Sequence, residues 1–163
     1  MTLDHPNTSE GKTMPKPLEA LSGIDPKLEE NIRRTVAKIP IMETLSISVE
    51  GFAPGMSAIR VPYKKSLDGF FDCFHGGLLM TAADTVACFA VMTETGPEQM
   101  MATTDMNIRF LAPCTQDCVA IARLIKAGKT LCPVNVDLYE AESGKHVAVA
   151  QVNYIRLGGG KKS

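Results

Sequence analysis

The feature that most constrains this chain is a long apolar run over residues 74–93 that contains a single carboxylate. Gly76 and Gly77 follow His75 near the start of the run, and Asp84 lies in its middle. Because the run is apolar on nearly all sides of a helix, other parts of the protein must enclose it. A charged and unpaired carboxylate in such surroundings costs several kcal/mol, so Asp84 is expected to be paired, protonated or functional.

Composition limits the class of protein. A chain of 163 residues favours one domain with a substantial core, and its 45% hydrophobic residues are ordinary for a soluble globular protein. The formal net charge of −1 gives no indication of nucleic acid or an anionic membrane as a partner. Five cysteines, an odd number, indicate reduced thiols in a cytoplasmic protein, and the polar residues 1–21 do not resemble a secretory signal. Asp84 and the small residues around it favour a core helix over a membrane span.

Hydrophobic periodicity predicts the other elements. Asp25 and Pro26 are typical of a helix start, and apolar residues at helical spacing continue until Pro40 stops the run. Alternation with period two then predicts a hairpin, which a loop over residues 64–73 connects to the central helix at about 74–93. Four more strands are predicted at residues 101–111, 117–126, 131–141 and 146–156. Their short connections predict an antiparallel meander.

These elements predict an α+β fold, in which an antiparallel sheet of about six strands wraps around the long central helix, with an additional N-terminal helix. The expected organisation is a flexible extension over residues 1–22, one folded domain over residues 23–157 and a flexible tail over residues 158–163. Another subunit is expected to cover the surface that this arrangement leaves exposed.

Several short motifs, taken in their joint order and spacing, resemble the hotdog-fold acyl-CoA thioesterases of the PaaI-like type, within the 4-hydroxybenzoyl-CoA thioesterase-like superfamily. The resemblance covers roughly residues 43–157. The motifs are His75-Gly76-Gly77 with Asp84 nine residues after the histidine, and the segments 103–108, 126–131, 135–138 and 143–145.

The resemblance implies an enzyme that hydrolyses acyl-CoA to a carboxylic acid and coenzyme A, with no metal and no other cofactor. It implies that Asp84 is the general base or nucleophile, that the Gly76 N–H holds the thioester oxygen, and that the Thr103 hydroxyl assists. His75 would orient the helix start, although a capping or core histidine fits the sequence equally well. The chain departs from its relatives at Gly69, because they often place asparagine six residues before the histidine.

The same residues suit this chemistry on physical grounds. The first N–H groups of a helix lack internal partners, and Gly76 and Gly77 have no Cβ to keep an oxygen away. Gly77 and Asp84 share one helix face but lie about 10 Å apart along the axis. A single helix therefore cannot bring both groups to one reacting carbon. We expect an obligate homodimer in which Asp84 of one subunit completes a site with Gly76 of the other, and further association into a dimer of dimers.

Other residues are candidates for substrate binding. The apolar helix and its Met- and Phe-rich neighbours favour a medium-chain or aryl acyl group. The candidates for contacts to the thioester and to the phosphates of coenzyme A are Gly77, Thr104, Lys126, Lys129, Arg109 and Arg156. Each of the basic residues fits a solvated surface position as well.

Three other functions fit parts of the pattern. A non-catalytic acyl-CoA-binding domain would share the fold and bind the ligand without turnover. A hydratase or dehydratase would want an Asp/His pair at the helix entry, and His75 precedes the helix differently. A purely structural oligomer would leave the carboxylate of Asp84 unexplained.

Overall fold

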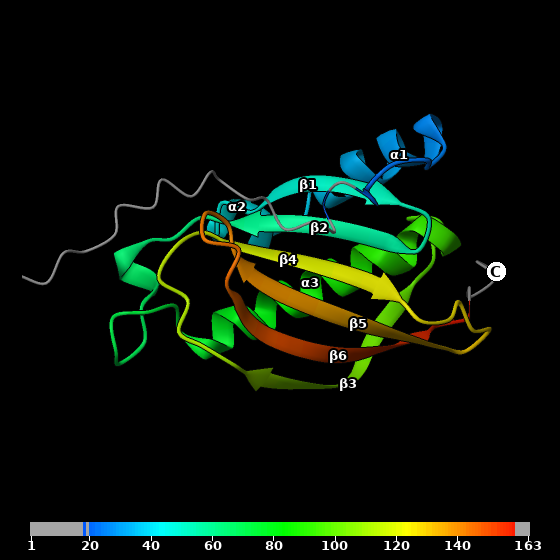
Figure 1. Cartoon of the computed structure of the whole chain (residues 1–163). Coiled ribbons are helices and arrows are strands. Elements are labelled where there is room, and N and C mark those ends of the chain that lie inside the picture. The colour runs from blue at the N-terminus through cyan, green and yellow to red at the C-terminus, as the bar shows by residue number, and fades with distance from the viewer. Residues whose placement is uncertain (1–17, 19, 159–163) are drawn as a thin grey trace, which may run out of the picture.

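In a computed structural model of the protein, which describes residues 18 and 20–158, a six-stranded antiparallel sheet wraps around one long helix (Figure 1). The helices are α1 (Pro26–Val36), α2 (Pro40–Thr44), the short 3₁₀ helix η2 (Lys65–Leu67) and α3 (Gly76–Thr95). The strands are β1 (Ser48–Ala53), β2 (Met56–Val61), β3 (Met101–Phe110), β4 (Cys118–Leu124), β5 (Leu131–Glu140) and β6 (His146–Arg156). The α+β hotdog fold expected from the sequence is confirmed.

The N-terminal helix α1 begins where the sequence predicts. The Asp25 carboxylate accepts a hydrogen bond from the Leu28 N–H at 2.9 Å, and Pro26 occupies the first helical position. Ile32 and Val36 form its buried stripe. The sequence analysis missed α2, which starts at Pro40, because a proline that ends one helical pattern can also open the next helix, where its missing N–H is not needed.

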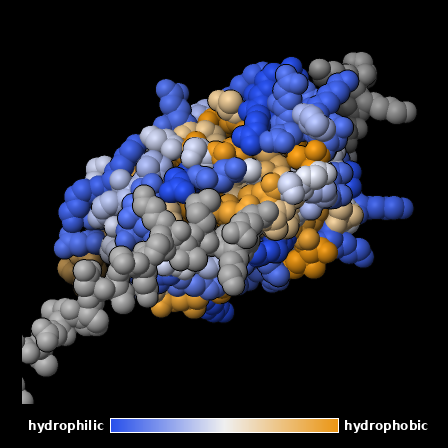
Figure 2. Space-filling view, turned by 45° about the horizontal axis from the view of Figure 1, so that its top comes forward, coloured by the Kyte–Doolittle hydropathy of each residue, from blue (hydrophilic) through white to orange (hydrophobic). Residues whose placement is uncertain are grey.

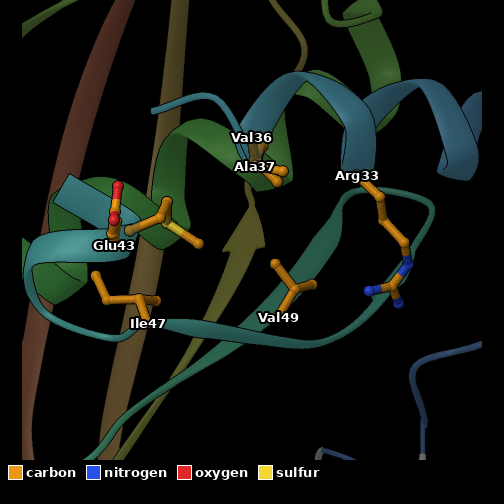
Figure 3. Close-up of a pocket in the computed structure, with 7 residues that line it drawn as sticks. Arg33, Val36, Ala37, Glu43, Ile47 and Val49 are labelled. Atoms are coloured by element: carbon orange, nitrogen blue, oxygen red, sulfur yellow. The ribbon is translucent and has the colours of Figure 1, made fainter. Parts of the chain in front are cut away.

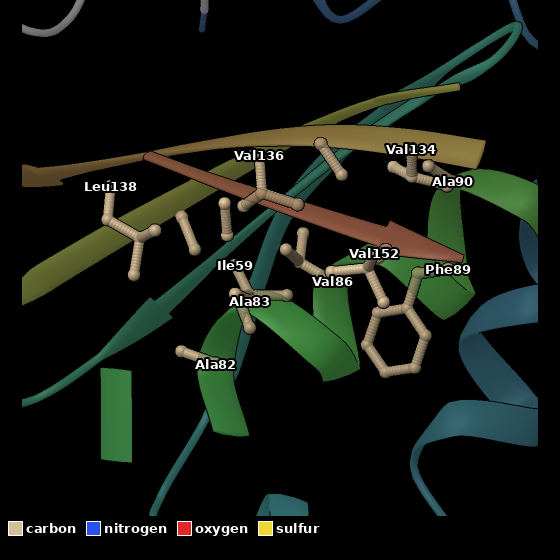
Figure 4. Close-up of a cluster of buried hydrophobic side chains, with 14 of the residues drawn as sticks. Ile59, Ala82, Ala83, Val86, Phe89, Ala90, Val134, Val136, Leu138 and Val152 are labelled. Carbon is tan, nitrogen blue, oxygen red and sulfur yellow. The ribbon is translucent and has the colours of Figure 1, made fainter. Parts of the chain in front are cut away.

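The central helix α3 lies in the hydrophobic core. Figure 4 shows Ala83, Val86 and Ala90 directed at the sheet, where they pack against side chains such as Val136 and Val152. By length and composition α3 could cross a membrane, but most of its apolar residues are buried inside this fold. Alanines let the strands approach the helix backbone closely, so the sheet can curl around α3 and fix its register.

The prediction that the last four strands form a meander is wrong for β3, the first of them. Strands β4, β5 and β6 form a meander, but β3 pairs with β6 at the sheet edge, giving the order β1-β2-β4-β5-β6-β3. Segment 111–117 therefore carries the chain across to β4, beside β2. The buried Glu140 carboxylate anchors this crossover by accepting hydrogen bonds from the N–H and hydroxyl of Thr115 at 2.8 and 3.0 Å. Connection length alone cannot distinguish such a crossover from a hairpin.

The expected flexible extension over residues 1–22 and tail over residues 158–163 lie largely outside the described residues. Within the first range, Leu18 and Leu21 pack on the outer face of the sheet against a cluster that includes Val119 and Ile121. Gly51 makes room for this contact, since a Cβ there would lie 3.3 Å from Leu21 Cβ.

Apolar side chains also gather on the molecular surface between hydrophilic regions, as the face in Figure 2 shows.

Candidate active site

Asp84, in the middle of α3, has one carboxylate oxygen held by two hydroxyl groups. Thr103 Oγ1 donates to Asp84 Oδ1 at 2.8 Å, and Tyr154 OH donates to the same oxygen at 2.7 Å. Within the described part of the chain, Asp84 Oδ2 accepts no hydrogen bond, and the residue is half-buried. The carboxylate is therefore fixed through one oxygen, and the other is available to a water molecule or a substrate.

The sheet register explains why both hydroxyls reach the same carboxylate. Thr103 on β3 and Tyr154 on β6 are direct cross-strand partners, and the strand pairing is interrupted by a bulge at Thr104. The bulged residue does not contact Asp84. Its hydroxyl shares one proton between two acceptors, Asp105 Oδ2 at 3.0 Å and the Asn153 carbonyl at 3.1 Å. Thr104 is therefore held within the edge strand, whereas Thr103 faces the helix.

Two other ionisable groups lie near Asp84, the Tyr154 hydroxyl and the Cys88 thiol, and both have a raised pKa. Burial, reinforced by the neighbouring Cys88 and Asp84, raises the pKa of Tyr154, so its hydroxyl remains a donor. Burial and the Asp84 charge raise the pKa of Cys88, one helical turn further along α3, to about 11. The Cys88 thiol contacts Met101 Sδ at 3.8 Å. At neutral pH Cys88 is thus a thiol rather than a nucleophilic thiolate.

The start of α3 is capped by His75. Its Nδ1 accepts a hydrogen bond from the Gly77 N–H at 3.0 Å, which assigns the remaining ring proton of the neutral imidazole to Nε2. The Leu78 and Leu79 N–H groups point to the His75 carbonyl at 2.9 and 3.4 Å. Among the described residues, Gly76 has the one N–H of this first turn with no partner. The Gly76 N–H is thus available to another acceptor, and the Gly77 N–H belongs to the cap.

An apolar groove of about 310 Å³ is lined in part by Gly76. Phe110, at the end of β3, lies directly over the glycine, because a Cβ at position 76 would come within 3.0 Å of Phe110 Cζ. The groove is lined by Cys73, Phe74, Gly76, Leu79, Phe110, Leu111, Ala112, Pro113 and Cys114. Its apolar walls beside a free N–H fit an apolar group attached to a carbonyl.

Gly76 and Asp84 do not meet within one chain. They are eight residues apart on a continuous helix, which separates them by about 12 Å along its axis. Strand β3 runs beside this part of α3, so that Thr103 lies at Asp84 and Phe110 lies at Gly76. The two halves of the expected site therefore sit at opposite ends of the edge strand β3.

The basic candidates divide between the two ends of β3. Lys126 and Lys129 lie in the loop between β4 and β5, which Arg156 holds by donating to the Gly128 carbonyl at 3.2 Å. Arg156 also pairs with Met101, so this loop lies at the end of the sheet where Asp84 is found. Arg109 is exposed at the other end, next to Phe110.

Two further findings limit where the candidate site can lie and which ligands it can hold. A larger groove of about 500 Å³ lies between α1, α2 and β1, lined by residues such as Val36, Ile47 and Val49, and it contains none of the candidate residues (Figure 3). The five cysteines are free thiols. In the described part of the chain, no three His, Cys, Asp or Glu side chains are grouped so that they could hold a metal ion.

Sequence reasoning missed Tyr154 and Phe110. A tyrosine or phenylalanine in an alternating strand has the same signature whether it fills the core or serves a site. For Tyr154 a usable signal was its hydroxyl, because the residues just before it on the same face of the last strand are apolar. Only the pairing of β6 with β3, however, makes Tyr154 a partner of Thr103.

The sequence and the fold of this chain are both similar to those of known proteins. The family model of the thioesterase superfamily matches residues 72–156. The chain is 30% identical to human acyl-coenzyme A thioesterase 13 over 121 residues, which cover 72% of this chain and 79% of that protein. Among solved structures, the Escherichia coli PaaI protein from the phenylacetic acid degradation operon has a TM-score of 0.76 at 19% identity and covers 84% of this chain and 98% of its own. A thioesterase family protein from Silicibacter pomeroyi has a TM-score of 0.75 at 22% identity, with 80% and 98% covered.

Proposed function

Because the chain belongs to the thioesterase superfamily and is a thioester hydrolase, we propose that it converts an acyl-CoA and water into a carboxylic acid and coenzyme A. The observation that carries this proposal is the Asp84 carboxylate, whose Oδ1 is held by two hydroxyls while Oδ2 is free. A carboxylate fixed in this way has the position of a general base or a nucleophile.

In the proposed reaction, Asp84 Oδ2 takes a proton from a water molecule as the water oxygen attacks the thioester carbonyl carbon. The C–O bond forms, and the carbonyl oxygen becomes an oxyanion that the Gly76 N–H stabilises. Collapse of the tetrahedral intermediate breaks the C–S bond, and the Asp84 carboxylic acid returns its proton to the leaving thiolate. Alternatively, Asp84 attacks the carbonyl carbon itself, the C–S bond breaks and coenzyme A leaves as the thiolate, which gives a mixed anhydride. Water then hydrolyses the anhydride to the carboxylic acid and the free Asp84 carboxylate, and the proton released goes to the thiolate. Single-turnover hydrolysis in ¹⁸O-labelled water distinguishes the two routes, because only the anhydride route can place the label in Asp84.

A homodimer would bring the two halves of the site together. Strand β3 is an edge strand, and its residues are half-buried or exposed, so it can pair with a second copy of itself. Two β3 strands paired antiparallel about a two-fold axis would place the Phe110 end of one beside the Thr103 end of the other. Gly76 of one subunit would then approach Asp84 of the other, as the separation of these residues within one chain requires. Association of two such dimers is a further expectation.

The same pairing supports the proposed contacts to coenzyme A. Lys126 and Lys129 lie at the Asp84 end of their own subunit, and pairing would bring Arg109 of the other subunit to that end. Their ammonium and guanidinium groups would meet the phosphates of coenzyme A, while the groove beside Gly76 would receive the acyl group. This arrangement favours a medium-chain or aryl acyl group over acetyl.

Free-thiol release from acetyl-, decanoyl-, palmitoyl- and phenylacetyl-CoA tests the proposal. We expect turnover that is faster for apolar acyl groups than for acetyl. Binding of decanoyl-CoA by calorimetry, with no thiol released from any member of the panel, would instead support the alternative of a non-catalytic acyl-CoA-binding domain.

A further inference from the structure

The loop between η2 and α3 presents two adjacent aromatic rings to the solvent. Phe70 is 93% exposed and Phe71 is 81% exposed, more than any other large hydrophobic residue in the described part of the chain. The two rings pack edge to face with their centroids 5.0 Å apart. Single exposed apolar residues are common, but a paired aromatic tip is typical of a surface that contacts a ligand or a partner.

Backbone hydrogen bonds fix the base of this tip. The Gly69 N–H donates to the Cys73 carbonyl at 2.7 Å, which closes the loop directly below the two rings. The next residue, Phe74, donates its N–H to the Cys114 carbonyl at 2.8 Å and is buried. The aromatic pair is therefore held on a short, closed turn and is not the middle of a long unsupported loop.

Side chains reinforce the same turn. The Asp68 carboxylate, 8% exposed, accepts a hydrogen bond from the Tyr63 hydroxyl at 2.9 Å and forms an ion pair with Lys65 at 2.9 Å. Lys65 also pairs with Asp72 on the far side of the tip. Lys65 is thus paired with two carboxylates, and together these three groups carry a formal net charge of −1 next to the rings.

The loop that carries the tip continues directly into the groove beside Gly76. Cys73 and Phe74, which follow the two rings in the chain, line one side of this groove, and Phe110 and Leu111 line another. Phe110 and Leu111 are themselves 53% and 55% exposed. Along the chain, only Asp72 separates the aromatic tip from Cys73, the first residue that lines the groove.

We propose that Phe70 and Phe71 select the acyl group: they contact the distal part of a long apolar acyl chain whose thioester carbonyl is bound at the Gly76 N–H. This inference rests on the proposed acyl-CoA hydrolysis and specifies its substrate class. An anionic lipid surface is disfavoured as the partner, because Lys65 is paired with two carboxylates whose combined charge exceeds its own. Two side chains on a closed turn are too small a surface to hold a second subunit on their own.

The test compares chain-length preference in the intact protein. We expect the F70S/F71S variant to lose about tenfold or more in kcat/KM for decanoyl-CoA and less than about twofold for acetyl-CoA, because the lost contact is apolar and distal to the carbonyl. The loss should lie in KM rather than in kcat. The F70L/F71L variant keeps apolar side chains on the same turn and should retain most of the decanoyl-CoA activity. Because the rings are exposed, both variants should unfold at nearly the wild-type temperature.

Several outcomes would overturn the inference. An unchanged ratio of decanoyl-CoA to acetyl-CoA activity in F70S/F71S would refute the acyl contact while leaving the proposed hydrolysis intact. A loss of oligomer in F70S/F71S, measured by sedimentation, would assign the rings to a subunit interface. Loss of wild-type binding to phosphatidylcholine/phosphatidylserine vesicles would assign them to a membrane surface. Absence of thiol release by the wild-type protein from every acyl-CoA would overturn the proposed function together with this inference.

Discussion

The hydroxyl of Tyr154 donates a hydrogen bond to Asp84 Oδ1 at 2.7 Å, although 70 residues separate the two in sequence. The same hydroxyl lies 2.9 Å from the Asp84 backbone carbonyl, so the last strand of the sheet is tied to the middle of the central helix. Burial raises the pKa of Tyr154 and keeps its proton in place. Tyr154 therefore acts on the candidate base by positioning it.

Replacing Tyr154 with phenylalanine should lower kcat about tenfold, because a hydrogen bond to a charged group contributes roughly 1.5 kcal/mol or more. The KM for acyl-CoA should change little, since Tyr154 contacts the carboxylate and not the substrate. The Y139F variant is the matched control, because Tyr139 stacks on His146 and does not contact Asp84. A Y154F variant that loses stability but keeps its kcat would assign Tyr154 a purely structural role.

The cap of α3 provides a second prediction. His75→Ala removes the acceptor for the Gly77 N–H and should lower the free energy of unfolding by about 1 kcal/mol. His75→Asn keeps a side-chain acceptor that suits the cap and should recover most of that loss. Urea unfolding of the two variants measures the difference. Equal destabilisation in both would contradict a capping role for His75.

The elements of this fold follow from local patterns, whereas the strand order does not. The Asp25–Pro26 helix start and the alternation of Val134, Val136 and Leu138 in β5 are encoded within a few residues and were predicted correctly. The position of β3 depends on the crossover at 111–117, whose anchor Glu140 lies 25 residues further along the chain. No window of local sequence contains that relationship.

The anchor Glu140 gives stability a dependence on pH. Burial alone would raise the pKa of Glu140, but hydrogen bonds from Ser143 and Thr115 and the contact with Lys145 outweigh burial and hold it below 4.5. The ionised group therefore stabilises the fold fully above about pH 4.5, and this contribution is lost as the pH falls through the lower folded-state pKa.

The variant Glu140→Gln should be less stable than the wild type by about 1–3 kcal/mol at pH 7. The difference between the two should shrink as the pH falls below about 4.5. Chemical unfolding of both proteins between pH 7 and pH 3 measures this, with the exposed neighbour Glu142→Gln as control. A difference that stays constant over this range would exclude Glu140 as the source of the pH dependence.

The composite site predicts complementation between two inactive variants. In a mixed dimer of Asp84→Asn and Gly76→Val chains, one site would carry both changes and the other would carry neither. Random mixing should therefore restore about a quarter of the wild-type activity from two nearly inactive proteins. Purified heterodimers that remain inactive would mean that each site is built within a single chain.

The candidate site was predictable only in part. Asp84 is visible in the sequence because a carboxylate in an apolar helix is unusual, and Gly76 is visible because it opens that helix. Gly77 was expected to bind substrate, but its N–H donates to His75 Nδ1. Only the side-chain geometry distinguishes this capping N–H from the unpaired N–H of Gly76. Tyr154 was missed because a strand tyrosine has no local mark that separates core from site.

The most direct test of the account is the rate of free-thiol release by Asp84→Asn with the best acyl-CoA substrate. Asparagine keeps the size of the side chain but cannot accept a proton from water. We predict that kcat falls at least about 100-fold while acyl-CoA binding and the unfolding temperature stay close to those of the wild type. Turnover within a few-fold of the wild type would contradict the assignment of Asp84 and the mechanism built on it.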